Sequence, residues 1–265
     1  MSNKSGSSEQ TISLPKGGGE LKGLGESFSP DLHTGTGNFS VPISLPTGRN
    51  SFQPEIGLVY STGNSNSCFG LGWQLNIPGV SRKTSKGIPR YLDSLEEKQQ
   101  DTFLLSGAED LVPVAVDAAS KWTQYRPRTE GLFALIKRFK DSENDYWEVK
   151  SKNGLTSFYN LPNLLAEDAT INFDPKRSNN IFDWKLAETR DPFNNKIKYQ
   201  YLRDQQQTDT RHWNQLYVEK IQYLDYQLEN GEEHFLVSII FEYDDVRPDA
   251  FSVYTSGYEI RTEKR

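Results

Sequence analysis

Apolar and polar residues alternate in three short stretches between residues 39 and 77. A period of two places every second side chain on one face of an extended strand, so each stretch predicts a strand with one buried face. Gly, Asn, Ser and Pro, which favour turns, separate the stretches. We therefore predict three consecutive strands joined by turns, with no residue pattern typical of catalysis. Their apolar positions are Phe39/Val41/Ile43/Leu45, Ile56/Leu58/Tyr60 and Phe69/Leu71/Trp73/Leu75/Ile77.

The third stretch alternates glycine with large side chains from Phe69 to Trp73. Because glycine has no Cβ, a ring or a second backbone can lie flat against such a strand. We interpret these glycines as packing residues. Pro42 and Pro46 fall on the face opposite the apolar residues of the first stretch. Proline cannot donate a hydrogen bond within a sheet, so we expect an edge position or a bulge there.

Further short strands follow at intervals of roughly ten residues, a spacing typical of a sandwich, a barrel or a wrapped sheet. Asn153-Gly154 lies between two apolar runs and predicts a hairpin with a type I′ turn. Residues 161–180 are polar and contain Pro162 and Pro175, so we interpret them as an irregular surface loop. The predicted strands of this region are residues 103–105, 111–116, 132–139, 146–149 and 155–159.

Aromatic residues mark a second hairpin after residue 181. Trp184 and Leu186 precede the turn sequence Asp-Pro-Phe-Asn-Asn, after which Ile197, Tyr199 and Tyr201 alternate with polar residues. The pattern predicts two strands joined by a tight turn.

The last strong apolar run covers residues 235–243 and follows a predicted strand at 216–223. Phe235, Val237 and Ile239 occupy one face of this run, and Leu236 and Ile240 add apolar side chains to the other. A strand that is apolar on both faces is usually covered on both sides. We therefore expect this strand to be buried within the fold.

The composition agrees with an all-β fold made of many short antiparallel strands and hairpins. Aromatic residues form 12% of the 265 residues, and 20 glycines and 13 prolines favour turns over helices. We expect residues 1–19, which are rich in Ser and Gly, to be a flexible lead-in. Residues 20–265 then form one β-module, which we expect to be an amino-terminal segment of a longer protein.

Few residues suggest metal, redox or nucleic-acid chemistry. The net charge of −6 argues against a nucleic-acid partner, which requires a basic face. Cys68 is the only cysteine and cannot form an intrachain disulfide. His33, His212 and His234 are far apart in the sequence and have no ligand partner at metal-binding spacing. We therefore predict no catalytic residue, no cofactor, no metal site and no nucleic-acid partner.

The segments FSPDLHTGTGNFSVPISLPTGR and FQPEIGLVYSTGNSNSCFGLGWQLNIPGVSR resemble the opening of the SpvB-type module, which is named for a Salmonella virulence plasmid protein. The same module begins the B subunits of insecticidal toxin complexes, the Tc toxins. The later Trp-x-Leu and Tyr-x-Tyr hairpin is similar to an RHS/YD repeat, with Asn194-Asn195 in place of the usual Gly-Asn. The residues that we single out as the structural motif are Phe39, Pro54, Gly57, Tyr60, Phe69, Gly70, Gly72 and Trp73.

The resemblance implies a structural role without enzymatic activity. In Tc toxins the SpvB-like region is implied to form part of an RHS-like wrapped shell. The B subunit builds this shell with an RHS-repeat C subunit, whose toxic part it encloses, and docks on a pore-forming A subunit. The alternative is a leader module for an actin-modifying ADP-ribosyltransferase. That enzyme requires Ser-Thr-Ser and Glu-x-Glu motifs, which this chain lacks, so the transferase activity is not expected in these residues.

A carbohydrate- or surface-binding β-module is a further alternative, in which exposed Trp122, Trp147 and Trp213 would stack on sugars. Aromatic residues in strands are more often core residues, which disfavours this interpretation. The polar amino terminus contains no apolar core of a secretory signal, and no apolar run is long enough to span a membrane. We expect export by a non-classical route, with the protein in the cytoplasm before export.

Overall fold

The structure is a computed structural model that describes residues 27–31, 36–93, 100–106, 109–129, 133–162, 170–208, 211–244 and 247–265. In these ranges the regular elements are strands, apart from one 3₁₀ turn, η1 (Arg49–Ser51). The predicted all-β, antiparallel fold is confirmed. The predicted lead-in at residues 1–19 lies outside the described residues. The chain divides into two compact units, one of residues 1–44 and 55–76 and a larger one of residues 45–54 and 77–265.

The smaller unit contains a four-stranded antiparallel sheet with the order β1-β2-β3-β6. Its strands are β1 (Ser27–Asp31), β2 (Thr36–Pro42), β3 (Gly57–Ser61) and β6 (Trp73–Leu75). The first two predicted strands correspond to β2 and β3. Pro42 is the last residue of β2, which is an interior strand rather than the expected edge, so the missing donor falls where the ladder ends.

The third predicted strand is wrong as a single strand. The structure divides it into β5 (Gly70–Leu71), which pairs with β4 (Asn66–Ser67), and β6, which pairs with β3. Gly70 and Gly72 both have a positive φ, +108° and +81°, which turns the chain between the two strands. As a result Leu71 is 73% exposed and does not share a buried face with Trp73.

The larger unit is built on a twelve-stranded antiparallel sheet. Eight of its strands close into a barrel because β13 pairs with both β12 and β15. The barrel strands are β7 (Gly79–Arg82), β8 (Phe103–Leu105), β9 (Glu109–Asp117), β10 (Trp122–Pro127), β11 (Leu135–Lys140), β12 (Asp145–Lys150), β13 (Thr156–Tyr159) and β15 (Arg177–Arg190).

The side chains inside the barrel change in character along its length. On β12, the buried residues are Asp145, Trp147 and Val149. On β11, Arg138 pairs with Trp147 and Ile136 pairs with Val149. One end of the interior is therefore charged, the middle is aromatic and the other end is aliphatic. The aliphatic end contains Val80, Leu105, Leu111, Ile136 and Leu186, all buried.

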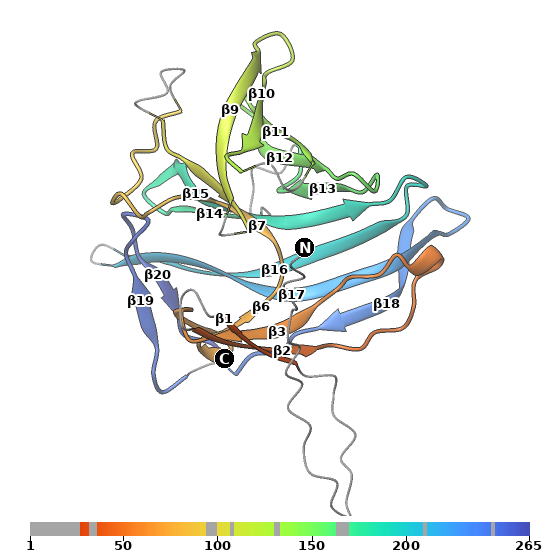
Figure 1. Cartoon of the computed structure of the whole chain (residues 1–265), viewed down its shortest axis with the longest axis horizontal. Coiled ribbons are helices and arrows are strands. Elements are labelled where there is room, and N and C mark those ends of the chain that lie inside the picture. Colours follow the sequence, from red (N-terminus) through yellow and green to blue (C-terminus); the bar gives the residue numbers. More distant parts are fainter. Residues whose placement is uncertain are drawn as a thin grey trace, which may run out of the picture. The chain divides into compact units, whose positions relative to one another are not determined.

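The sheet continues beyond the barrel as long strands that run side by side (Figure 1). β15 has 14 residues and pairs with β16, and β17 has 16 residues, which corresponds to roughly 50 Å. β18 is the last strand in the order and pairs only with β17 among the described strands. These further strands are β14 (Ile171–Asp174), β16 (Lys196–Gln207), β17 (His212–Gln227), β18 (Glu233–Ile240) and the separate hairpin of β19 (Phe251–Val253) and β20 (Ile260–Thr262).

Two predicted hairpins are present, and one predicted loop is not. β15 and β16 form the hairpin predicted from the aromatic pattern. β12 and β13 form the one at Asn153-Gly154, but only Gly154 has a positive φ, so the turn is a longer loop and not type I′. Residues 161–180 were expected to be an irregular loop. They contain β14 and the start of β15, which pair with each other. This pairing supplies hydrogen bonds to backbone groups that an irregular loop would leave without them.

β18 is not covered on both faces, contrary to the prediction. Leu236 is 66% exposed and Ile240 is 61% exposed. They lie on the face opposite the half-buried Phe235, Val237 and Ile239. The apolar pattern therefore marks an exposed edge strand, and the prediction failed because the pattern itself does not show what lies outside the sheet.

Candidate functional site

The residues singled out in the sequence form an aromatic cluster in the smaller unit. Tyr60 pairs with Phe39 on one side and with Trp73 on the other. The Trp73 ring meets Phe39 edge-on, with 6.1 Å between centroids, and lies 5.4 Å from the Tyr60 ring. All three side chains are half-buried. This cluster packs aromatic surface across three neighbouring strands.

Two glycines stand against this sheet at positions where a side chain does not fit. A Cβ on Gly57 would lie 2.8 Å from the Val41 carbonyl oxygen, and one on Gly72 would lie 2.5 Å from the Tyr60 ring. Gly70 differs, because its nearest neighbour would be 3.9 Å away. Gly57 and Gly72 therefore allow close packing, whereas Gly70 allows the chain to change direction.

The two remaining motif residues, Phe69 and Pro54, belong to different units. Phe69 is half-buried and lies between β4 and β5 in the smaller unit. Pro54 is buried but belongs to the larger unit. The structure thus brings together all the motif residues except Pro54 within one unit, and none of their side chains is a titratable group apart from the Tyr60 phenol.

The charged end of the barrel is a second concentration of unusual residues, and the sequence analysis did not identify it. Arg138 donates two hydrogen bonds to Asp145, from Nε to Oδ1 at 2.9 Å and from Nη2 to Oδ2 at 2.7 Å. The two side chains are only 4% and 8% exposed. The Arg138 guanidinium also lies 4.9 Å from the ring centroids of both Phe103 and Trp184. The faces of these rings attract the guanidinium and offset part of the hydration that it loses on burial.

Arg82 enters the same end of the barrel from β7. Its Nε donates to the Ile181 carbonyl oxygen at 2.7 Å, and its Nη1 donates to Asp101 at 2.8 Å and to Asp93 at 3.2 Å. Its Nη2 is buried and has no hydrogen-bond partner among the described residues. Within the described ranges, Arg82 therefore has one guanidinium nitrogen without an acceptor, and its side chain is shielded from solvent.

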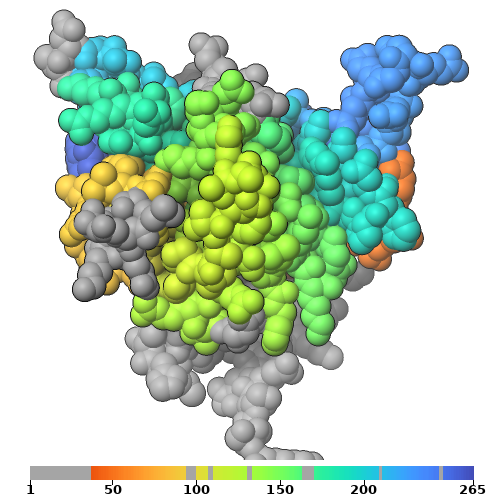
Figure 2. Space-filling model, turned by 90° about the horizontal axis from the view of Figure 1, so that it is seen from above, coloured from red at the N-terminus to blue at the C-terminus, as the bar shows by residue number. Residues whose placement is uncertain are grey.

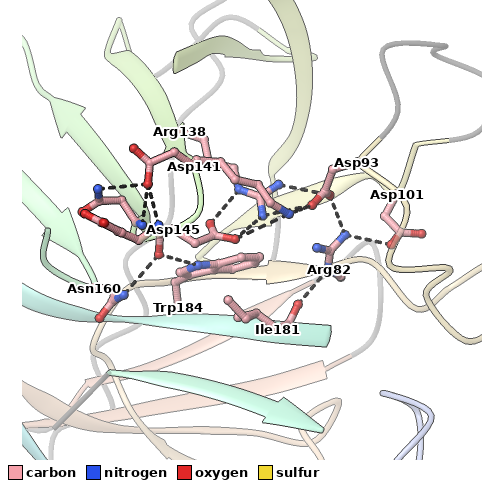
Figure 3. A network of polar contacts seen from close by, with 12 residues as sticks. Arg82, Asp93, Asp101, Arg138, Asp141, Asp145, Asn160, Ile181 and Trp184 are labelled. Carbon is pink, nitrogen blue, oxygen red and sulfur yellow. Dashed lines mark hydrogen bonds and ion pairs between the residues drawn. The ribbon is translucent and has the colours of Figure 1, made fainter. Parts of the chain in front are cut away.

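The Asp93 carboxylate joins the two arginines (Figure 3). It lies 3.2 Å from Nη1 of Arg82 and 3.1 Å from Nη1 of Arg138, and it pairs closely with Lys140. Burial alone would raise the pKa of Asp93, but Arg138, Arg82 and Lys140 outweigh it and hold this pKa well below its usual range. The surrounding cations therefore favour the ionised form of Asp93.

A cavity of about 620 Å³ opens beside this network. Its charged lining residues are Arg138, Lys140, Lys121, Asp93 and Asp117, and β9 and β10 also contribute apolar surface from Pro113, Val114, Val116 and Trp122. Figure 2 looks onto the face where β9 and β10 lie at the centre. The lining therefore combines charged groups with apolar surface, as ligand sites commonly do.

A signal for this site was present in the sequence. Arg138 lies two residues after Ile136, and Asp145 lies two residues before Trp147, so both charges fall in phase with core positions. Charged residues at core positions of a strand are rarely buried without a partner. Asp93 carried no such signal, because it lies in a connection outside the regular pattern.

Other candidate sites receive no support. Among the described residues there is no group of three or more His, Cys, Asp or Glu residues that could hold a metal ion. Trp147 and Trp213 are 0% and 6% exposed, which agrees with the favoured core interpretation and rules out sugar stacking by these two side chains. Trp122 is half-buried beneath Lys137. In the part of the chain that the structure describes, no helix is long and apolar enough to cross a membrane.

Comparison with known proteins identifies the family. The family model described as Salmonella virulence plasmid 65kDa B protein, SpvB, matches residues 31–265. The chain belongs to the SpvB family. The match includes both compact units, so the aromatic cluster and the charged barrel end are parts of one SpvB region.

Relatives of this SpvB-family chain are toxin and virulence proteins. It is 27% identical to the protein named mono(ADP-ribosyl)transferase SpvB of Salmonella choleraesuis, over 95% of this chain and 49% of that protein. The Salmonella typhimurium protein of the same name gives the same identity. The chain thus spans about half the length of the curated relatives that it matches.

Solved structures of SpvB-like regions share the fold. A chain in the crystal structure of TcdB2-TccC3 is 25% identical, with a TM-score of 0.75 over 96% of this chain and 14% of that chain. The amino-terminal domain of the Salmonella typhimurium effector SpvB has a TM-score of 0.69 over 84% of each chain, at 23% identity. A Photorhabdus luminescens Tc holotoxin pore contains a chain with a TM-score of 0.76 at 24% identity.

Proposed function

We infer that this chain is a non-enzymatic structural module of a bacterial toxin component and builds part of the wall of a hollow β-shell that encloses a toxic cargo. The observation that carries this proposal is the likeness to the TcdB2-TccC3 chain, at 25% identity and a TM-score of 0.75 over 96% of the present chain. The match covers both compact units, so it supports a shared architecture and not a single shared motif.

The long strands of the larger unit are the part suited to a wall. β15, β16 and β17 run side by side over 14, 12 and 16 residues, and β18 follows at the edge with Leu236 and Ile240 exposed. An exposed apolar edge strand is a template for pairing with a further strand. The sheet is therefore able to continue from β18 into the next part of a shell.

The closed barrel has a different role in this proposal. Its interior is filled by Phe103, Tyr125, Trp147 and Trp184, whose rings contact one another at centroid distances between 4.9 and 5.9 Å. These packed rings block the barrel as a channel, and the cavity of about 620 Å³ beside its charged end is too small to enclose an unfolded cargo domain. The barrel therefore stiffens one end of the long strands, and the cargo space lies elsewhere in the assembly.

The proposed partners are an RHS-repeat C subunit, which completes the shell, and a pore-forming A subunit, on which the shell docks. The proposed location is outside the bacterium after export by a non-classical route. The structural relative pairs TcdB2 with TccC3, which agrees with a two-protein assembly in that system.

The test is assembly of the native, full-length protein. We would purify it from the producing bacterium, image the particles by electron microscopy and treat them with protease. We expect hollow particles in which a segment of an RHS-repeat partner resists cleavage until the particle is opened. Solid particles or a protein without such a partner would contradict the proposal. The double variant Leu236→Lys/Ile240→Lys should prevent assembly and leave the fold intact, whereas Phe193→Lys, at a 76% exposed turn residue, should assemble normally.

A second function is favoured by the curated relatives, which are named mono(ADP-ribosyl)transferase SpvB and of which this chain matches 49%. In that case the module would be the leader of a transferase. The same purified native protein would then transfer ADP-ribose from NAD to actin and would contain no RHS-repeat partner. The two functions are therefore distinguished by one preparation.

A further inference from the structure

A single carboxylate at the floor of the barrel cavity is held by three cationic side chains. Asp93 contacts Arg82 at 3.2 Å, Arg138 at 3.1 Å and Lys140 more closely still. Guanidinium groups present forked donors that match carboxylate geometry, and the low-dielectric surroundings strengthen the attraction. The three cations form what we call the cradle.

The cradle belongs to the barrel, but the carboxylate does not. Arg82 is on β7 and Arg138 and Lys140 are on β11, whereas Asp93 lies in the connection between β7 and β8. The arginine side chains are 0% and 4% exposed, and the Asp93 side chain is 19% exposed. The donors are therefore fixed by the sheet, and the acceptor is brought to them from the solvent side.

The cradle also has donor capacity that Asp93 does not use. Nη2 of Arg82 is buried without an acceptor in the described part of the chain. A buried donor without a partner costs about 1–3 kcal/mol, so an additional acceptor at this point would be favourable. Arg82 is not among the residues that line the cavity, so a ligand in the cavity would reach the cradle through Arg138 and Lys140.

The cavity beside the cradle determines what could carry such an acceptor. Beside its charged groups, the lining includes Pro113, Val114 and Val116 of β9 and Trp122 and Tyr125 of β10. This surface suits an aliphatic or aromatic body. The cations in the lining, Lys121, Arg138 and Lys140, outnumber its carboxylates, Asp93 and Asp117, so a carboxylate is favoured over a cationic group.

We propose that the Arg82–Arg138–Lys140 cradle is a carboxylate-binding site, that Asp93 occupies it as an internal ligand, and that the adjoining cavity takes a carboxylate carried on an apolar body. The ligand is either a free organic acid or an acidic side chain flanked by apolar residues in an extended polypeptide. This proposal does not depend on the shell function, because it concerns only the barrel of the isolated chain.

Asp93 competes with any added carboxylate ligand for the cradle. A tethered carboxylate is present at high effective concentration, so a ligand binds only to the fraction of molecules in which Asp93 has left the cradle. Binding to the wild-type protein is therefore expected at millimolar concentration. Asp93→Asn, which keeps the shape and removes the charge, should bind the same ligand tighter by on the order of tenfold.

The experiment is calorimetric titration at low salt with two matched pairs of probes. One pair is 4-phenylbutyrate and 4-phenylbutyramide, and the other is the capped peptide acetyl-Leu-Phe-Glu-Leu-amide and its Gln counterpart. We expect at least one of the two acids to bind, and we expect its matched amide not to bind. Preference for phenylbutyrate alone identifies an organic acid as the ligand class, and preference for the Glu peptide identifies a polypeptide.

Lys140→Gln supplies a test that leaves the two buried arginines unchanged. The Lys140 side chain is 42% exposed, so its replacement should be tolerated. In the Asp93→Asn background, where no internal carboxylate competes, it should weaken acid binding by roughly two- to fivefold. Lys150→Gln, at a 52% exposed lysine paired with Glu148 outside the cavity, should leave binding unchanged. If the wild-type protein binds neither acid in preference to its amide at millimolar concentration, the proposal is wrong, whether or not Asp93→Asn folds.

Discussion

Arg138 and Asp145 lie on neighbouring strands and face each other inside the barrel, joined by two hydrogen bonds of 2.9 and 2.7 Å. Both side chains are removed from water, which costs free energy, and their attraction offsets this cost only while the pair is complete. The pair therefore fixes the register of β11 and β12 at the charged end without being a large net source of stability.

Removing one partner of this pair should be strongly destabilising. We expect Asp145→Ala to lower the free energy of unfolding by about 3–5 kcal/mol, because Arg138 is then left buried without its two hydrogen bonds to Asp145. Urea denaturation followed by tryptophan fluorescence measures the change.

The exposed pair on the same hairpin is the control. Lys150 and Glu148 are 3.0 Å apart, with side-chain exposures of 52% and 18%. Glu148→Ala should cost less than about 1 kcal/mol. The double variant Arg138→Met/Asp145→Leu should recover most of the stability lost by Asp145→Ala. An equal loss in the double and the single variant would mean that the network is stabilising as a whole.

The network should also make stability depend on pH in a defined direction. The cations around Asp93 lower its pKa below the unfolded value of about 3.9. Its contribution is therefore complete above that value and is lost as the pH falls through the lower, folded pKa. We expect the stability difference between wild type and Asp93→Asn to be constant from about pH 5 to 7 and to shrink below about pH 4.

Urea midpoints measured at several pH values between 3 and 7 would give this difference. A difference that instead changes between pH 5 and 7 would show that another group titrates in the network. The Asp117→Asn variant is a suitable comparison, since the pKa of Asp117 is lowered chiefly by hydrogen bonds from Ser120 and Ala119, with a smaller contribution from Lys137.

Replacing the central tryptophan should cost more stability in the barrel cluster than in the aromatic cluster of the smaller unit. Trp147 is fully buried and contacts Phe103, Tyr125 and Trp184, so Trp147→Ala should cost about 3–5 kcal/mol. Trp73 is only half-buried, and Trp73→Ala should cost less, at about 2 kcal/mol. Thermal melting of both variants beside wild type measures the order, and a larger loss for Trp73→Ala would contradict it.

Elements whose pattern is local could be predicted from the sequence. The hairpin of β15 and β16 is marked by Trp184 and Leu186 before its turn and by Tyr199 after it, and the Asp191 side chain accepts the backbone hydrogens of Phe193 and Asn195 within that turn. These residues lie within a short stretch, so alternation and turn chemistry together decide the structure.

Features that depend on distant segments could not be predicted. The barrel closes where Tyr159 of β13 pairs with Leu186 of β15, and no local pattern shows which strands will meet. The exposure of Leu236 on β18 depends on the absence of a covering layer, and the position of Asp93 depends on the path of a connection. The charged end of the barrel was therefore missed although Arg138 and Asp145 lie in phase with core positions.

Gly72 allows the close packing of the motif to be tested against its backbone strain. Gly70 and Gly72 both have a positive φ, so alanine at either position is strained. Only at Gly72 would the new Cβ also clash, at 2.5 Å from the Tyr60 ring. We expect Gly70→Ala to cost about 1 kcal/mol and Gly72→Ala to cost about 1–3 kcal/mol more, the usual penalty of overpacking. Adding Tyr60→Leu should remove part of the excess at Gly72 and none of the cost at Gly70. Equal costs for the two glycine variants, measured by thermal melting, would show that the ring does not require Gly72 and that turn geometry alone explains both residues.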